Sequence, residues 1–285
     1  MVAASLGLDL IFGGDRSGWK FWVMQALYTT FIGGSAFLYA AVSKTDFPSA
    51  TKFDQRPPAA HVVWGCVSVV CLICCMSQIN GLFLDLIEAL GLNRPSVDLE
   101  DSFFGLIICA CLLPAFTEEV LFRGTIAQSL ANHDNKWAAL AISGALFAIF
   151  HANPAQTLHQ FVLGVLLTLL VLRSGSLWTS VIVHFFNNAL VVVISYTPLG
   201  ADEYWSLTAN TKVALPLMLA GMVGFALSVL LYVKTTKSRW QQPSSTDEEE
   251  VANDETNHRS SNGALIVGVF VCAVLWIAQL LIGVI

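Results

Sequence analysis

Charged residues are scarce in this sequence. Asp, Glu, Lys and Arg make up 12% of its 285 residues, whereas soluble globular domains carry about 25%. Apolar residues reach 55% and the mean hydropathy is +0.67. This balance excludes an ordinary soluble domain and predicts an all-α polytopic membrane protein whose helices form one bundle. The net charge of −6 says little about partners, because six of the twenty acidic residues cluster in one run, 245–258.

Several other features are absent. Basic patches with interleaved aromatic residues do not occur, which argues against nucleic-acid binding. The seven cysteines lie in hydrophobic segments, and the C-x-x-C pair Cys71 and Cys74 has no second pair to complete a zinc site. The N-terminus lacks a signal-peptide pattern and is expected to remain in the protein. No convincing internal repeat occurs, which weakens a transporter interpretation.

Hydrophobic segments predict eight membrane helices, because a crossing needs about twenty apolar residues. The shorter segments are expected to be buried among the others, since helix ends exposed to lipid leave backbone groups unsatisfied. The predicted helices are Trp19–Val42, Val62–Leu84, Phe103–Ala131, Trp137–His151, Leu158–Leu172, Leu177–Tyr196, Val213–Val233 and Ala264–Ile285.

These segments divide the chain into two N-terminal helices (1–102), a helical core (103–198), a seventh helix (199–233), an acidic linker (234–263) and a last helix (264–285). The linker has low complexity and is expected to be disordered. Lys and Arg are more numerous on the side of the bundle that holds the 44–59 loop and the linker. The positive-inside rule therefore places that side in the cytoplasm and both termini outside.

Three charged residues, Glu118, Glu119 and Arg123, lie within the Phe103–Ala131 segment, where each charge costs about 2.5–3.5 kcal/mol or more. Glu119 and Arg123 are four apart and are expected to pair, either to lock helices together or to support a site. Glu118 points about 100° away from that pair, and burial makes proton transfer by such a carboxyl feasible near neutral pH. Pro114 removes a backbone hydrogen bond one turn earlier, so a kink or local opening is expected.

Two histidines and an asparagine add polar groups inside the predicted helices. His151 ends a short helix, where a lone histidine is more often a cap or a packed core residue. His184 and Asn188 are four apart on one helix face, whereas Asn187 lies on a different face. Interhelical hydrogen bonding alone would explain a single His–Asn pair.

The depths of these groups indicate that they can meet inside the bundle, whereas scattered structural histidines would have no reason to do so. At about 1.5 Å per residue, Glu118 and His151 lie roughly 20 Å from the cytoplasmic ends of their helices. By the same rise, His184 and Asn188 lie roughly 12 and 18 Å from theirs. A carboxyl beside a histidine can activate water, and a second histidine with an amide N–H can hold a tetrahedral oxyanion. Together these groups predict hydrolysis of an amide bond without a covalent enzyme intermediate.

Two alternatives stay open. Glu118, His151 and His184 also match the ligands of a zinc site with an open position, although no H-E-x-x-H motif is present. A proton-coupled transporter would use Glu118 as its carrier, but it would not need Asn188. The absence of G-x-S-G and G-x-G-D argues against rhomboid-like serine and presenilin-like aspartyl sites.

The motifs resemble those of the intramembrane CAAX-protease and bacteriocin-processing (CPBP) family, also called Abi or type II CAAX prenyl endopeptidases. Its signature of E-E-x-x-x-R, F-x-x-x-H and H-x-x-x-N is similar to "EEVLFR" (118–123), "FAIFH" (147–151) and "HFFNN" (184–188), in the same order. The resemblance covers roughly 103–195.

The resemblance implies an eight-helix bundle with a conical, water-filled catalytic cavity and a glutamate-dependent protease without a required cofactor, zinc being possible. It implies that Glu118 and His151 activate water, that His184 and Asn188 form the oxyanion hole, and that Glu119 and Arg123 support them. The implied substrate is a membrane-associated peptide or a prenylated or otherwise lipidated protein. The residue pattern of the motifs favours a protein of the bacterial cytoplasmic membrane over one of the eukaryotic endoplasmic reticulum. A non-catalytic scaffold or regulator of this family is the remaining alternative.

Overall fold

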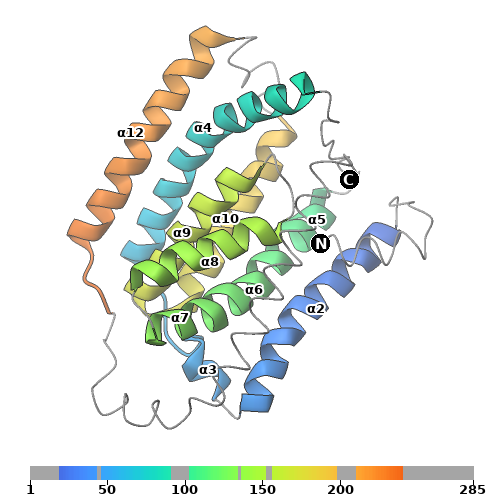
Figure 1. Cartoon of the computed structure of the whole chain (residues 1–285), viewed down its shortest axis with the longest axis vertical. Coiled ribbons are helices and arrows are strands. Elements are labelled where there is room, and N and C mark those ends of the chain that lie inside the picture. Colours follow the sequence, from blue (N-terminus) through green and yellow to red (C-terminus); the bar gives the residue numbers. More distant parts are fainter. Residues whose placement is uncertain are drawn as a thin grey trace.

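The chain folds as a bundle of helices, as predicted (Figure 1). In the computed structural model, five helices are long and apolar enough to cross a membrane, and no strand occurs in the part of the chain that is described. The predicted helix Ala264–Ile285 and most of the predicted linker lie outside that part. The described residues are 19–43, 46–90, 103–133, 136–151, 156–197 and 210–239.

The observed helices follow the predicted segments closely, although α4 extends beyond its predicted bounds at both ends. The polar connection predicted at 44–59 contains a short helix, α3, and the Phe103–Ala131 segment is one continuous helix with two π-helical stretches. The elements are α2 (Trp19–Ser43), α3 (Phe47–Ala50), α4 (Ala59–Ala89), α5 (Phe103–Leu106), η1 (Ile107–Leu112), α6 (Leu113–Glu119), η2 (Val120–Ile126), α7 (Ala127–His133), α8 (Lys136–Phe150), α9 (Thr157–Ser174), α10 (Leu177–Ser195) and α12 (Thr211–Thr235).

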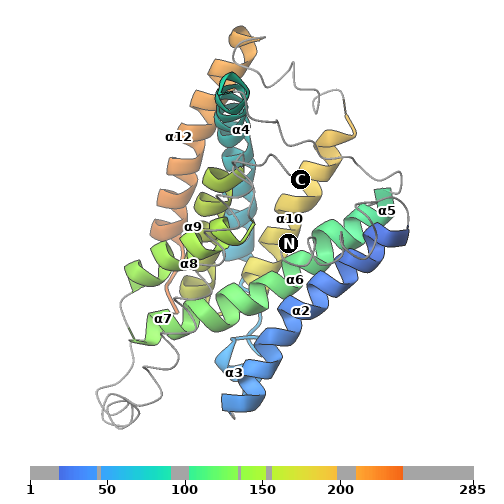
Figure 2. The same ribbon diagram turned by 45° about the vertical axis from the view of Figure 1, so that its right-hand side comes forward.

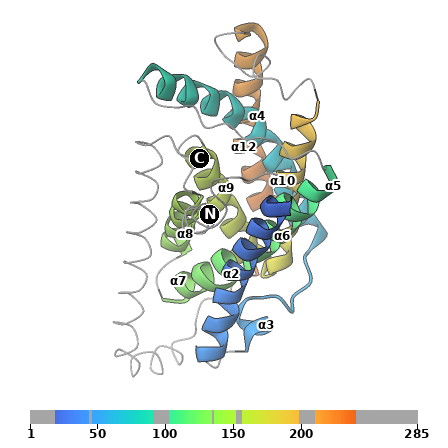
Figure 3. The same cartoon turned by 90° about the vertical axis from the view of Figure 1, so that its right-hand side faces the viewer.

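The helices that carry the predicted site residues lie between two flanking layers. α2 runs along the α5–α7 helix on one flank, and α4 and α12 pack side by side on the other (Figures 2 and 3). Between them, α10 contacts α4, α6 and α9. Large apolar side chains fill this centre, including Leu72, Phe147, Leu163, Leu167 and Leu170, all of them fully buried.

Pro114 is accommodated by a change of helix type rather than by a break. The π-helical stretch η1 directly precedes the turn that holds Pro114, and the chain then returns to α-helix in α6. Pro114 has no N–H to donate to the carbonyl of Ala110, four residues earlier. That same carbonyl accepts a hydrogen bond of 3.4 Å from Asn188 Nδ2 of α10. The predicted local opening therefore takes the form of a π-helix whose exposed carbonyl contacts α10.

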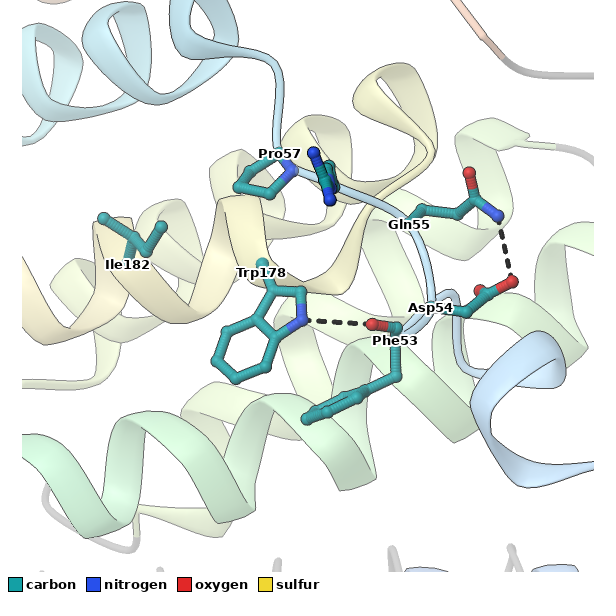
Figure 4. Close-up of a pocket in the computed structure, with 7 residues that line it drawn as sticks. Phe53, Asp54, Gln55, Pro57, Trp178 and Ile182 are labelled. Carbon is teal, nitrogen blue, oxygen red and sulfur yellow. Dashed lines mark hydrogen bonds between the residues drawn. The ribbon is translucent and has the colours of Figure 1, made fainter.

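The loop between α2 and α4 packs against the start of α10. Trp178 Nε1 donates to the Phe53 carbonyl at 3.0 Å, and Ser176 Oγ donates to the Gln55 carbonyl at 2.6 Å. A pocket of about 230 Å³ opens beside this contact (Figure 4). Its lining holds none of the predicted site residues; the lining residues are Phe53, Asp54, Gln55, Arg56, Pro57, Trp178 and Ile182.

The packing of α4 against α12 depends on a backbone contact at Gly221. A Cβ added there would lie 2.7 Å from the Cys75 nitrogen and 2.8 Å from the Cys71 carbonyl oxygen. Because these are backbone atoms, the helices must separate, and such overpacking costs about 1–3 kcal/mol. Gly221→Ala is therefore expected to lower the melting temperature in detergent. Gly34→Ala is the matched control, since nothing lies within 4 Å of its added Cβ; equal melting of the two variants would contradict this packing.

Candidate active site

Glu119 and Arg123 form the predicted ion pair at the centre of the bundle. Arg123 Nη1 lies 2.6 Å from Glu119 Oε1, and both side chains are 0% exposed. Arg123 Nη2 also donates to the Gly164 carbonyl at 3.2 Å, and the guanidinium lies 4.1 Å from the centre of the Phe147 ring. Arg123 is thus held by a carboxylate, a carbonyl and an aromatic face, which offsets the cost of burying its charge.

His184 joins this pair. Its Nδ1 lies 2.9 Å from Glu119 Oε1, the same oxygen that accepts from Arg123. Because an arginine already donates to this carboxylate, Glu119 is ionised and can only accept, so Nδ1 of His184 carries the proton. The remaining nitrogen, Nε2, is then the atom available to a bound molecule, and it donates a hydrogen bond only when the imidazole is protonated.

Glu118 faces His151. His151 Nε2 lies 3.7 Å from Glu118 Oε2, while Nδ1 of His151 donates to the Phe147 carbonyl at 2.8 Å. The Nδ1 bond fixes the tautomer, so Nε2 presents its lone pair to the carboxyl group. A separation of 3.7 Å is too long for a direct hydrogen bond. The His151 side chain is 18% exposed, compared with 4% for Glu118.

Phe147 is the shared support of the two histidines. Its ring centre lies 4.5 Å from that of His151 and 5.6 Å from that of His184. Phe147 is fully buried and also contacts Arg123. The two halves of the site, one around Glu118 and one around Glu119, therefore meet on a single aromatic side chain.

Asn188 lies one turn beyond His184, and its side-chain amide contacts the α5–α7 helix. Its Nδ2 donates to the Ala110 carbonyl at 3.4 Å, and its Oδ1 accepts from Asn187 Nδ2 at 3.0 Å. Asn187 is buried. Sequence reasoning gave Asn187 no role, although two adjacent asparagines in an apolar helix were a visible signal.

The fit of a metal can be tested on the donor geometry. In the part of the chain that is described, no three His, Cys, Asp or Glu side chains converge as a metal centre requires. Glu118 and His151 face each other, while His184 contacts Glu119 through Nδ1 and keeps Nε2 available. The described residues therefore form no assembled three-ligand zinc centre, and we derive no step through zinc.

Comparisons with known proteins agree with this helical membrane architecture and its buried polar site. Residues 100–190 match the family described as "Type II CAAX prenyl endopeptidase Rce1-like". The "Putative membrane peptidase YdiL" of Bacillus subtilis (strain 168) is 28% identical over 93 residues, which is 33% of this chain and 38% of that relative. No solved structure matches significantly.

The class of protein is thus a polytopic α-helical membrane protein, and the segment that carries its polar site is peptidase-like. Through residues 100–190 the chain is similar to the CPBP family of intramembrane proteases, as its motifs predicted. All the predicted site residues fall inside the matched segment; they are Glu118, Glu119, Arg123, His151, His184 and Asn188. The match to a bacterial relative is consistent with the predicted bacterial membrane.

Proposed function

We propose that the chain is an intramembrane endopeptidase that hydrolyses a peptide bond with water activated by Glu118 and His151. The observation that carries this proposal is the approach of His151 Nε2 to Glu118 Oε2 at 3.7 Å inside the helix bundle. A water hydrogen-bonded to both atoms loses a proton to the carboxylate as its oxygen attacks the scissile carbonyl. The same proton then passes to the leaving amine, so no covalent enzyme intermediate forms.

His184 and Asn188 are the proposed oxyanion donors. Protonated His184 offers Nε2–H, while its Nδ1–H bonds to Glu119 and stabilises the imidazolium. Asn188 Nδ2 donates a hydrogen bond of 3.4 Å to the Ala110 carbonyl. A hydrogen bond of this length is weak and is readily replaced by one to a substrate oxygen. Glu119 and Arg123 act as supporting residues, since they orient His184.

The proposed substrate is a membrane-associated peptide or a prenylated or otherwise lipidated protein, reached within the bilayer. The similarity of residues 100–190 to the CAAX prenyl endopeptidase family and the apolar helices around the site support this class. The activity is tested by incubating the purified protein with membrane peptides, half of them carrying a prenylated C-terminal cysteine motif, and identifying the products by mass spectrometry. Cleavage by the wild type supports an endopeptidase. If nothing is cut, a scaffold or regulator is the better interpretation.

A chelator separates the glutamate mechanism from its zinc alternative. Because the described donors do not converge on a metal centre, a strong chelator is expected to leave cleavage by the wild type unchanged. The measurement compares initial rates before and after prolonged chelation, with a known zinc protease treated in parallel as the control. Loss of activity that returns when zinc is added would favour the metal-dependent alternative.

A further inference from the structure

Asn187 is a buried neighbour of the proposed oxyanion donor. Its side chain hydrogen-bonds to that of Asn188, the next residue on α10. Asn187 is 3% exposed. Its side-chain oxygen, Oδ1, is buried, and none of the described donors completes a hydrogen bond of ordinary geometry to it.

The bond from Asn187 decides which end of the Asn188 amide faces the site. An asparagine side chain can rotate so that its oxygen and nitrogen exchange places, and only the nitrogen can donate to an oxyanion. Asn187 Nδ2 donates to Asn188 Oδ1 at 3.0 Å, and this bond fixes the position of the Asn188 oxygen. Nδ2 of Asn188 is left on the opposite side, where its bond to the Ala110 carbonyl is long.

We propose that Asn187 is a positioning residue for Asn188. This inference rests on the proposed hydrolytic function. Asn187 does not contact the substrate, because its role is exerted through the hydrogen bond to Asn188 Oδ1. A donor that is already oriented needs no rearrangement when the oxyanion forms, and this preorganisation is the source of its catalytic value.

A double-mutant cycle tests the inference. Removing one oxyanion donor costs about 10²–10³-fold in kcat, and losing only its orientation is expected to cost part of this, about tenfold. Asn187→Ala should therefore lower kcat with KM unchanged. In an Asn188→Ala background the same change should have no further effect, because the group that Asn187 orients is gone.

Ser228→Ala provides the control, since it removes another buried hydrogen bond, 2.9 Å from Ser68, away from the proposed site. It should change the melting temperature but not kcat. Independent, multiplying losses at Asn187 and Asn188, or a wild-type kcat for Asn187→Ala, would overturn the positioning role. If Glu118→Ala cuts like the wild type, or the wild type cuts nothing, the proposed function fails, and the positioning role fails with it. If Glu118→Ala is inactive but the losses at Asn187 and Asn188 multiply, the positioning role is rejected and the proposed function stands.

Discussion

Glu118→Gln is expected to reduce the cleavage rate about 10²–10⁴-fold, the range that a general base contributes. The amide has nearly the size of the carboxyl group but cannot accept the proton of the attacking water. Glu118 is 3% exposed and faces His151 Nε2 at 3.7 Å, so the substituted side chain occupies the same place. The loss should appear in kcat, because water activation belongs to the chemical step. Initial rates at saturating peptide measure it.

Glu88→Gln is the matched control. It makes the same chemical change at an exposed position at the end of α4 and should cut at the wild-type rate. Size-exclusion profiles and melting temperatures of both variants should match those of the wild type. Equal cleavage by Glu118→Gln and Glu88→Gln would contradict a general-base role for Glu118.

Glu119→Gln is expected to destabilise the bundle by about 3–5 kcal/mol, because it leaves the charge of Arg123 buried without its carboxylate. Arg123 and Glu119 are both 0% exposed and lie 2.6 Å apart. The double substitution Glu119→Gln with Arg123→Met removes both charges and should recover much of the lost stability. Cleavage should not recover with it, since His184 has lost the carboxylate that orients its imidazole.

Thermal unfolding in one detergent, measured beside the cleavage rate, separates these effects. The single variant should melt well below the wild type, and the double variant should melt close to it while remaining slow. A Glu119→Gln protein that melts like the wild type would show that the ion pair does not stabilise the bundle. A double variant with full activity would show that Glu119 is not needed to orient His184.

The sequence was sufficient for the helices and for contacts within one helix. Runs of apolar residues located the described membrane helices, because the length of a crossing is fixed by the bilayer. The spacing of Glu119 and Arg123 predicted their pairing, because residues four apart are neighbours on a helix. Pro114 predicted a local opening, but the sequence did not show that a π-helix would supply it.

Contacts between helices were harder to predict from the sequence. Similar depths predicted that His151 and His184 could lie near the glutamates. The rise per residue, however, says nothing about the rotation of each helix around its axis. The assignment of His151 to Glu118 and of His184 to Glu119 therefore required the structure. Asn187 was placed on a different face from Asn188, which is correct for the backbone, yet its side chain bends to reach its neighbour.

The most direct test of hydrolysis at Glu118 is cleavage of one membrane peptide in ¹⁸O-labelled water by the wild type and by Glu118→Gln. The proposed mechanism predicts that the wild type releases a fragment whose new C-terminal carboxylate carries one ¹⁸O atom from the solvent. Glu118→Gln should release none above background. The same labelled fragment from both proteins at equal rates would contradict the assignment of Glu118 as the residue that activates water.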